Sequence, residues 1–240
     1  MKYTLLAIAF CFSTIGHAQW GNNKKIKGNG KMTTETRTTK DYDQISCSGN
    51  FDYILVSGNE GQLKLEGEEN LLPYIITEVK GNNLVVKVED NINLSTSGSK
   101  TIKITIPFES ISSVALAGSG DLWTEDTIKS DKLQVSLAGS GDVTIKTNAN
   151  TVEGSLAGSG DLTLKGSTNK LKASIAGSGD IHGFDLTSDY TEVAISGSGD
   201  AKVVCHKELK ARVAGSGDIQ YKGNPLKEDS KVAGSGSISN

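Results

Sequence analysis

Apolar and polar positions alternate with a period of two through the second half of the chain, around a recurring Ala-Gly-Ser-Gly-Asp motif. Each copy has an aliphatic residue two places before its first glycine and a second apolar residue directly after the aspartate or its equivalent. Alternation of this period predicts strands with one buried face. The first aliphatic column is Leu116, Leu137, Leu156, Ile175, Ile195, Val213 and Val232; the second is Leu122, Val143, Leu162, Ile181, Ala201, Ile219 and Ile238.

The motif, with near variants, recurs seven times at spacings of 21, 19, 19, 20, 18 and 19 residues. No helical pattern lies between the copies, so each repeat predicts one coil of a stack. We therefore expect an all-β fold, a parallel β-helix (β-solenoid) with about 19 residues per coil. An antiparallel sandwich or barrel is the alternative, although hairpins give no reason for one motif to recur at one phase. The motif glycines are Gly118, Gly120, Gly139, Gly141, Gly158, Gly160, Gly177, Gly179, Gly197, Gly199, Gly215, Gly217, Gly234 and Gly236.

Glycine suits a corner where stacked backbones crowd, because it has no side chain and reaches positive φ. With Leu137 inside, the period of two turns Gly139 and Gly141 inward and Ser140 and Asp142 outward. Each coil is then expected to have one strand entering the motif and a second leaving it. A polar turn such as residues 166–169 completes the coil.

The outward aspartates predict a ladder of like charges, so something must offset their repulsion. Hydrogen bonds to the backbone or splaying into solvent would do so, and we then expect no metal. Calcium is the alternative, because Gly- and Asp-rich β-rolls bind it, although those rolls repeat every nine residues. The ladder comprises Asp121, Asp142, Asp161, Asp180, Asp200 and Asp218, with Ser237 at its end.

Residues 1–18 resemble a cleaved signal peptide, with Lys2, an apolar run and small residues ending at Ala18. The apolar run is too short to span a bilayer, so no transmembrane segment is expected in the mature chain. Residues 19–40 are polar and predict a flexible lead-in. We expect one domain over 41–240, with irregular coils over 41–113 that cap the regular repeats of 114–240. Residues 45–54 resemble a diverged motif with Cys47 at the first glycine position.

Charge and cysteine content narrow the classes of function. The chain has 25 basic and 28 acidic residues, which gives no basic footprint for nucleic-acid binding. Cys11 belongs to the predicted signal peptide, and Cys47 and Cys205 lie 158 residues apart. We therefore expect the last two to stay unpaired. No metal spacing such as Cys-x-x-Cys is present.

Candidate catalytic groups are few. His182 and His206 are the only histidines after the leader, and both fall in polar segments. Cys205 and His206 are adjacent in a predicted strand, so their side chains point to opposite faces and cannot form a nucleophile pair. No nucleophile elbow, zinc motif or P-loop is present. We expect no catalytic residues and no cofactor. A polysaccharide-active enzyme is the alternative, because β-helices often carry such sites.

The order of these features resembles one known family. The chain resembles the "putative auto-transporter adhesin, head GIN domain" family of Bacteroidetes-type bacteria. The resemblance lies in the start at residues 43–56, in the segments 81–88 and 102–107, and in the repeated Gly-Ser-Gly-Asp. The resemblance covers about residues 40–240. It implies an exported, non-catalytic β-helical protein with a pectin-lyase-like fold. It also implies adhesion to an unknown surface ligand, a glycan or a protein, with the chain in the periplasm, at the cell surface or secreted.

Overall fold

The computed structural model describes residues 23–240, which are mostly β-strand, with one turn of 3-10 helix, η1 (Leu72–Tyr74), among them. The predicted signal peptide and the start of the lead-in lie outside the described residues. No helix within 23–240 is long and apolar enough to cross a bilayer.

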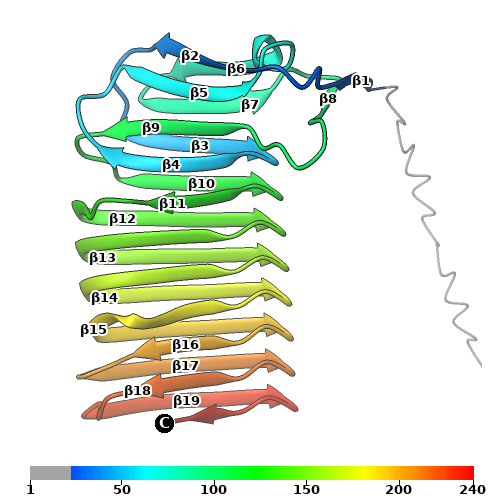
Figure 1. Cartoon of the computed structure of the whole chain (residues 1–240). Helices are drawn as coiled ribbons and strands as arrows, with labels where there is room; N and C mark the ends of the chain where they lie inside the picture. Colours follow the sequence, from blue (N-terminus) through cyan, green and yellow to red (C-terminus); the bar gives the residue numbers. More distant parts are fainter. Residues whose placement is uncertain (1–22) are drawn as a thin grey trace, which may run out of the picture.

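From Ser113 onward the chain winds into a parallel β-solenoid whose coils stack along one axis (Figure 1). Leu156 lies between Leu137 and Ile175 on the neighbouring strands. The first motif glycines stay in register from Gly49 through Gly234. This register confirms the predicted solenoid over the sandwich. Its strands are β10 (Ser113–Gly118), β11 (Asp121–Thr124), β12 (Ile128–Gly139), β13 (Val143–Gly158), β14 (Leu162–Gly177), β15 (Ile181–Gly197), β16 (Ala201–Val204), β17 (Glu208–Gly215), β18 (Ile219–Lys222), β19 (Lys227–Gly234) and β20 (Ile238–Ser239).

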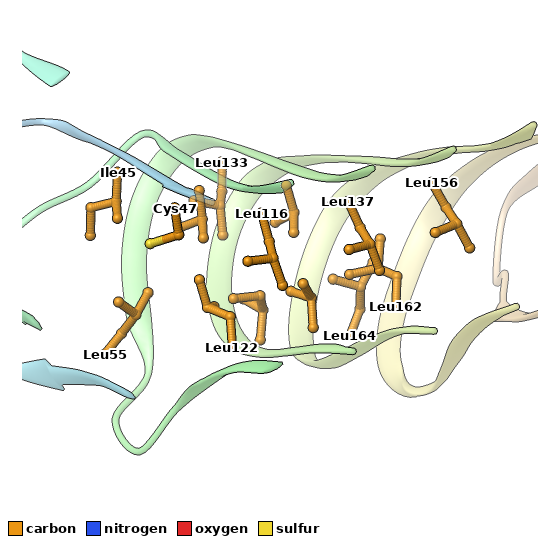
Figure 2. Close-up of a cluster of buried hydrophobic side chains, with 14 of the residues drawn as sticks. Ile45, Cys47, Leu55, Leu116, Leu122, Leu133, Leu137, Leu156, Leu162 and Leu164 are labelled. Atoms are coloured by element: carbon orange, nitrogen blue, oxygen red, sulfur yellow. The ribbon is translucent and has the colours of Figure 1, made fainter. Parts of the chain in front are cut away.

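The core lies between the strands that enter the motif and the strands that leave it. Figure 2 shows Leu137 and Leu156 on one side of the coil pointing toward Leu162 and Leu164 on the other. All four side chains are buried. Burying one such side chain contributes about 1.5–3 kcal/mol, and a single coil cannot bury its own apolar face. The stacking of coils therefore holds the fold together.

The second corner of the coil differs from the expected polar turn. Pairing continues through it, with Gly166 beside Thr147 and Thr168 beside Ala149, so β13 and β14 run unbroken around the bend. Gly166 adopts a positive φ of 116° there. The backbone N–H and C=O groups at this corner form their hydrogen bonds with the neighbouring coils, so a separate hydrogen-bonded turn is unnecessary.

Coils that depart from 19 residues absorb the difference locally. The coil between Gly177 and Gly197 has one extra residue, and the register of β14 and β15 shifts between Thr163 and Lys165. Lys165 consequently pairs with Asp185. A β-bulge of this kind keeps the motif glycines aligned on both sides of the insertion.

The N-terminal part caps the stack with both parallel and antiparallel strand pairs, where irregular coils were expected. β3 pairs with β7 and β4 with β9 in parallel. β2 pairs with β5, β5 with β9, and β6 with β7, all antiparallel. Residues 24–38, expected as a flexible lead-in, form β1 and β2, so that expectation was wrong for them. The cap comprises β1 (Lys24–Lys27), β2 (Met32–Thr38), β3 (Gln44–Gly49), β4 (Asp52–Ser57), β5 (Gln62–Glu68), β6 (Ile75–Lys80), β7 (Asn83–Val88), β8 (Ile92–Ser95) and β9 (Lys103–Phe108).

The diverged motif in β3 also needs a correction. Cys47 pairs with Leu116 and therefore stands in the aliphatic column, whereas Gly49 pairs with Gly118. A buried thiol behaves as a small hydrophobe, which explains why cysteine fits that column. Phe51 takes the place of the second glycine, where its backbone carbonyl meets Gly120 of the next coil.

Candidate interaction faces

The Gly-Ser-Gly-Asp corner is built by close backbone contact between coils. A Cβ atom added at Gly141 would overlap the carbonyl oxygen of Gly120, and one added at Gly139 would overlap that of Gly118. Gly139 also has a φ of 138°, a conformation that L side chains rarely adopt. The corner therefore requires glycine at both positions, as the sequence predicted. It fixes the outward direction of the serine and aspartate beside it.

The aspartate ladder is held by backbone hydrogen bonds. The backbone N–H of Asp161 donates to Oδ1 of Asp142 at 3.1 Å, and the N–H of Asp180 donates to Oδ1 of Asp161 at 3.2 Å. The pattern holds along the file and ends where Ser237 donates to Asp218 from both N–H and Oγ. Each of the six carboxylates thus accepts a hydrogen bond from the next coil. These backbone hydrogen bonds correspond to the first of the two ways, named from the sequence, in which the repulsion could be offset.

One coil adds a histidine to this ladder. Nε2 of His182 lies 3.6 Å from Oδ2 of Asp161, and ligand atoms of Asp161, Asp180 and His182 lie within 4.8 Å of one another. All three side chains are half-exposed on the outer surface. His182 therefore sits beside carboxylates on an open face.

The outer surface of the strands that leave the motif carries a stacked polar column, which we call the polar face. Thr163 lies between Thr144 and His182 on adjacent strands, at the spacing of about 4.8 Å that parallel pairing imposes. Nearby, Nζ of Lys222 lies 4.0 Å from the ring centroid of Phe184. The polar face comprises Trp123, Thr144, Thr163, His182, Lys202 and Gln220.

The outer surface of the strands that enter the motif has a different character. Its outward side chains are alanines and serines around a shallow hollow of about 540 Å³. The alanine column is solvent-exposed. We call this surface the small-residue face. It consists of Ala115, Ser136, Ser155, Ser174 and Ala194 in one column and Ala117, Ala138, Ala157, Ala176, Ser196, Ala214 and Ala233 in the next.

A column of charged and amide side chains borders the small-residue face, and we call it the charged border. Lys210 binds Glu192 at 2.7 Å, and this bond lowers the pKa of Glu192. Glu153 accepts from Gln134 and pairs with Lys132 at 2.9 Å, and both partners lower its pKa. The border comprises Gln134, Glu153, Lys172, Glu192, Lys210 and Asp229.

The sequence interpretation noted that a small residue directly precedes each first glycine, but it recognised neither a surface there nor the charged column beside it. The signal of the other two columns lies three and five residues before the first glycine, where small residues recur in the first five copies and charged or amide residues in the last six.

The two cysteines are free and buried, as predicted. Burial raises the pKa of the Cys47 thiol far above its usual range. Cys205 is buried while His206 is exposed, and Sγ of Cys205 lies 3.6 Å from the carbonyl oxygen of Asp189. Both residues lie in the bend between β16 and β17, not in a strand as predicted, and one side chain is buried while the other is exposed, so they do not form a nucleophile pair.

Solved structures share this architecture. A "putative adhesin" from Bacteroides fragilis has 25% sequence identity and a TM-score of 0.85, covering 90% of this chain and 99% of that one. A "putative lipid binding protein" from Parabacteroides distasonis has 27% identity and a TM-score of 0.75 at the same coverage. A "putative adhesin" from Parabacteroides merdae, at 22% identity and a TM-score of 0.71, covers 90% and 98% and shows the fold alone.

No curated protein is significantly similar to the chain. The model of one family does match it, over residues 41–225. This match spans the cap from β3 onward and nearly all of the solenoid, including most copies of the motif. The resemblance noted from the sequence is thereby confirmed, and the chain belongs to the family described as "Putative auto-transporter adhesin, head GIN domain".

Proposed function

We propose that this chain is an exported, non-catalytic binding protein that attaches to a repetitive partner at a cell surface. Membership of an adhesin-named family supports binding to an external ligand. The signal-peptide pattern of residues 1–18 supports export. Fold alone does not define function, whereas the surface that the fold presents can favour one kind of partner.

The observation that carries the proposal is the polar face. It repeats one outward position in register over six coils. A partner with its own regular repeat, such as a polysaccharide chain or an ordered protein surface, meets outward side chains at equal intervals, although the residue type changes from coil to coil. Many weak contacts of this kind add up through multivalency without a deep pocket.

The test combines localisation with binding. Tagged protein is followed by cell fractionation and applied to glycan and whole-cell arrays beside the triple variant Thr144→Ala, Thr163→Ala, Lys202→Ala. We expect a surface or extracellular location and at least about tenfold weaker binding by the variant. The matched control, Ser136→Ala with Ser155→Ala, changes the small-residue face and leaves binding intact.

Two results would contradict the proposal. New reducing or unsaturated ends released from acidic polysaccharides would identify an enzyme. Equal binding by the polar-face variant and the control would move the ligand to another surface.

A further inference from the structure

The small-residue face is an unpartnered apolar sheet surface. Ala138, Ala157 and Ala176 are exposed in consecutive coils, around the hollow described above. We propose that two copies of this chain associate face to face through the small-residue face, with their solenoid axes antiparallel. The proposal concerns a different surface from the polar face and does not depend on the proposed function.

The charged border specifies the second copy as the partner. Read along the stack, it runs Gln134, Glu153, Lys172, Glu192, Lys210, Asp229. A two-fold axis parallel to the strands, between the coils of Lys172 and Glu192, brings the border against itself in reverse order. Lys172 then faces Glu192 of the second copy, and Glu153 faces Lys210. The surface is therefore complementary in charge to itself, as an isologous interface requires.

The same axis matches side-chain size. The column of Ser136 and Ser155 is small over the first coils but ends in Arg212 and Lys231. Reversal places Arg212 opposite Ser155 of the second copy and Lys231 opposite Ser136. The axis that pairs opposite charges thus also places long side chains opposite short ones.

The available area suits a dimer of moderate strength. Six coils at about 4.8 Å and the five strand positions from the charged border to the alanine column at about 3.3 Å give about 475 Å² per copy, or about 950 Å² in total. This is close to the roughly 1,000 Å² expected of a specific interface and stays below that of obligate dimers. We therefore expect a reversible monomer–dimer equilibrium.

The test uses full-length mature protein in sedimentation velocity over a concentration series. Glu153→Lys and Lys210→Glu each place like charges across the interface, and each should weaken the dimer about tenfold in Kd. The double variant restores the facing pairs between copies and should recover the dimer. These two residues lie three strands apart within one copy, so the recovery reports the contact between copies.

Mixing the two single variants provides an independent readout. One copy then has lysine at both positions and the other has glutamate at both, so the mixed dimer should form more strongly than either homodimer. Lys146→Glu, a charge reversal outside both the face and its border, is the matched control and should leave the equilibrium unchanged. Ala157→Arg should give a folded monomer, verified by circular dichroism.

Three outcomes would overturn the proposal: a chain that stays monomeric at the highest soluble concentration, a dimer that Ala157→Arg leaves intact, or failure of the double variant and of the mixture to recover the dimer. Protection of the small-residue face by a glycan or peptide in a monomeric chain would assign the face to that ligand instead.

Discussion

The second glycine of each motif tolerates no side chain, and its constraint comes from packing. A Cβ at Gly160 would overlap the carbonyl oxygen of Gly141 in the neighbouring coil. The backbone N–H of Gly160 is already bonded to the neighbouring coil, where it donates to the carbonyl oxygen of Gly139 at 3.2 Å. We expect Gly160→Ala to lower the free energy of unfolding by about 3 kcal/mol, measured by urea denaturation. Ser159→Ala, one residue away and exposed, should change it by less than about 0.5 kcal/mol. Equal midpoints for the two variants would contradict close contact at this corner.

Each aspartate of the ladder is both a hydrogen-bond acceptor and a negative charge, and two substitutions at one position can separate these roles. Oδ1 of Asp161 accepts the N–H of Asp180 and lies in a file of like charges. Asparagine keeps an acceptor oxygen and removes the charge, whereas alanine removes both. We expect Asp161→Ala to cost about 1 kcal/mol in thermal or urea unfolding and Asp161→Asn to cost nothing or to stabilise. A calcium-dependent rise in melting temperature that Asp161→Asn abolishes would instead support the calcium alternative.

At the scale of elements, a buried carboxylate ties the cap together. Glu68 at the end of β5 accepts hydrogen bonds from Oγ of Ser97 at 2.6 Å, from the Ser97 N–H at 2.8 Å and from the Gly30 N–H. The Ser97 hydroxyl is the largest influence that lowers the pKa of Glu68, and burial opposes it. Gly30 and Ser97 follow β1 and β8, so one side chain joins both strands to the end of β5.

This arrangement gives the cap a predictable response to acid. Because the folded pKa is depressed, the native state binds fewer protons than the unfolded state as the pH falls. The stabilisation is complete above the usual glutamate pKa of about 4.3 and is lost as the pH drops through the lower folded value. The urea midpoint of the wild type should therefore approach that of Glu68→Gln on acidification. Glu66→Gln, on the same strand, is the control. A constant difference between wild type and Glu68→Gln across this range would rule out the linkage.

Elements that repeat along the chain were easier to predict from the sequence than elements that do not. The coils from β10 onward were readable because Leu137, Leu156 and their equivalents recur at one phase, so a single pattern describes every layer. Apart from the diverged motif in β3, the cap has no repeat, and its antiparallel partners, such as β2 and β5, are set by tertiary pairing that local pattern does not encode. Cys47 was misplaced by two residues because the period of two also admits that alignment.

The candidate surfaces were less predictable than the fold. The aspartates were identified from sequence, together with the kind of bond that would stabilise them. The small-residue face was missed because exposed alanine and serine carry no chemical signature singly. Only the register that sets Ala157 beside Ala138 and Ala176 turns them into a surface.

Over the whole molecule, stability depends on the position of a coil in the stack, because each coil contacts only its neighbours. β14 is paired on both sides, to β13 and β15, whereas β19 is paired only to β17 and is exposed along its length. Its exposed edge carries charges, including Lys227, Glu228 and Asp229, that discourage unwanted strand addition. Native-state hydrogen exchange should therefore show amides of β19 exchanging at least about tenfold faster than those of β14. Uniform exchange along the stack would mean that the coils unfold as one cooperative unit, in which the loss of one coil destabilises all the others.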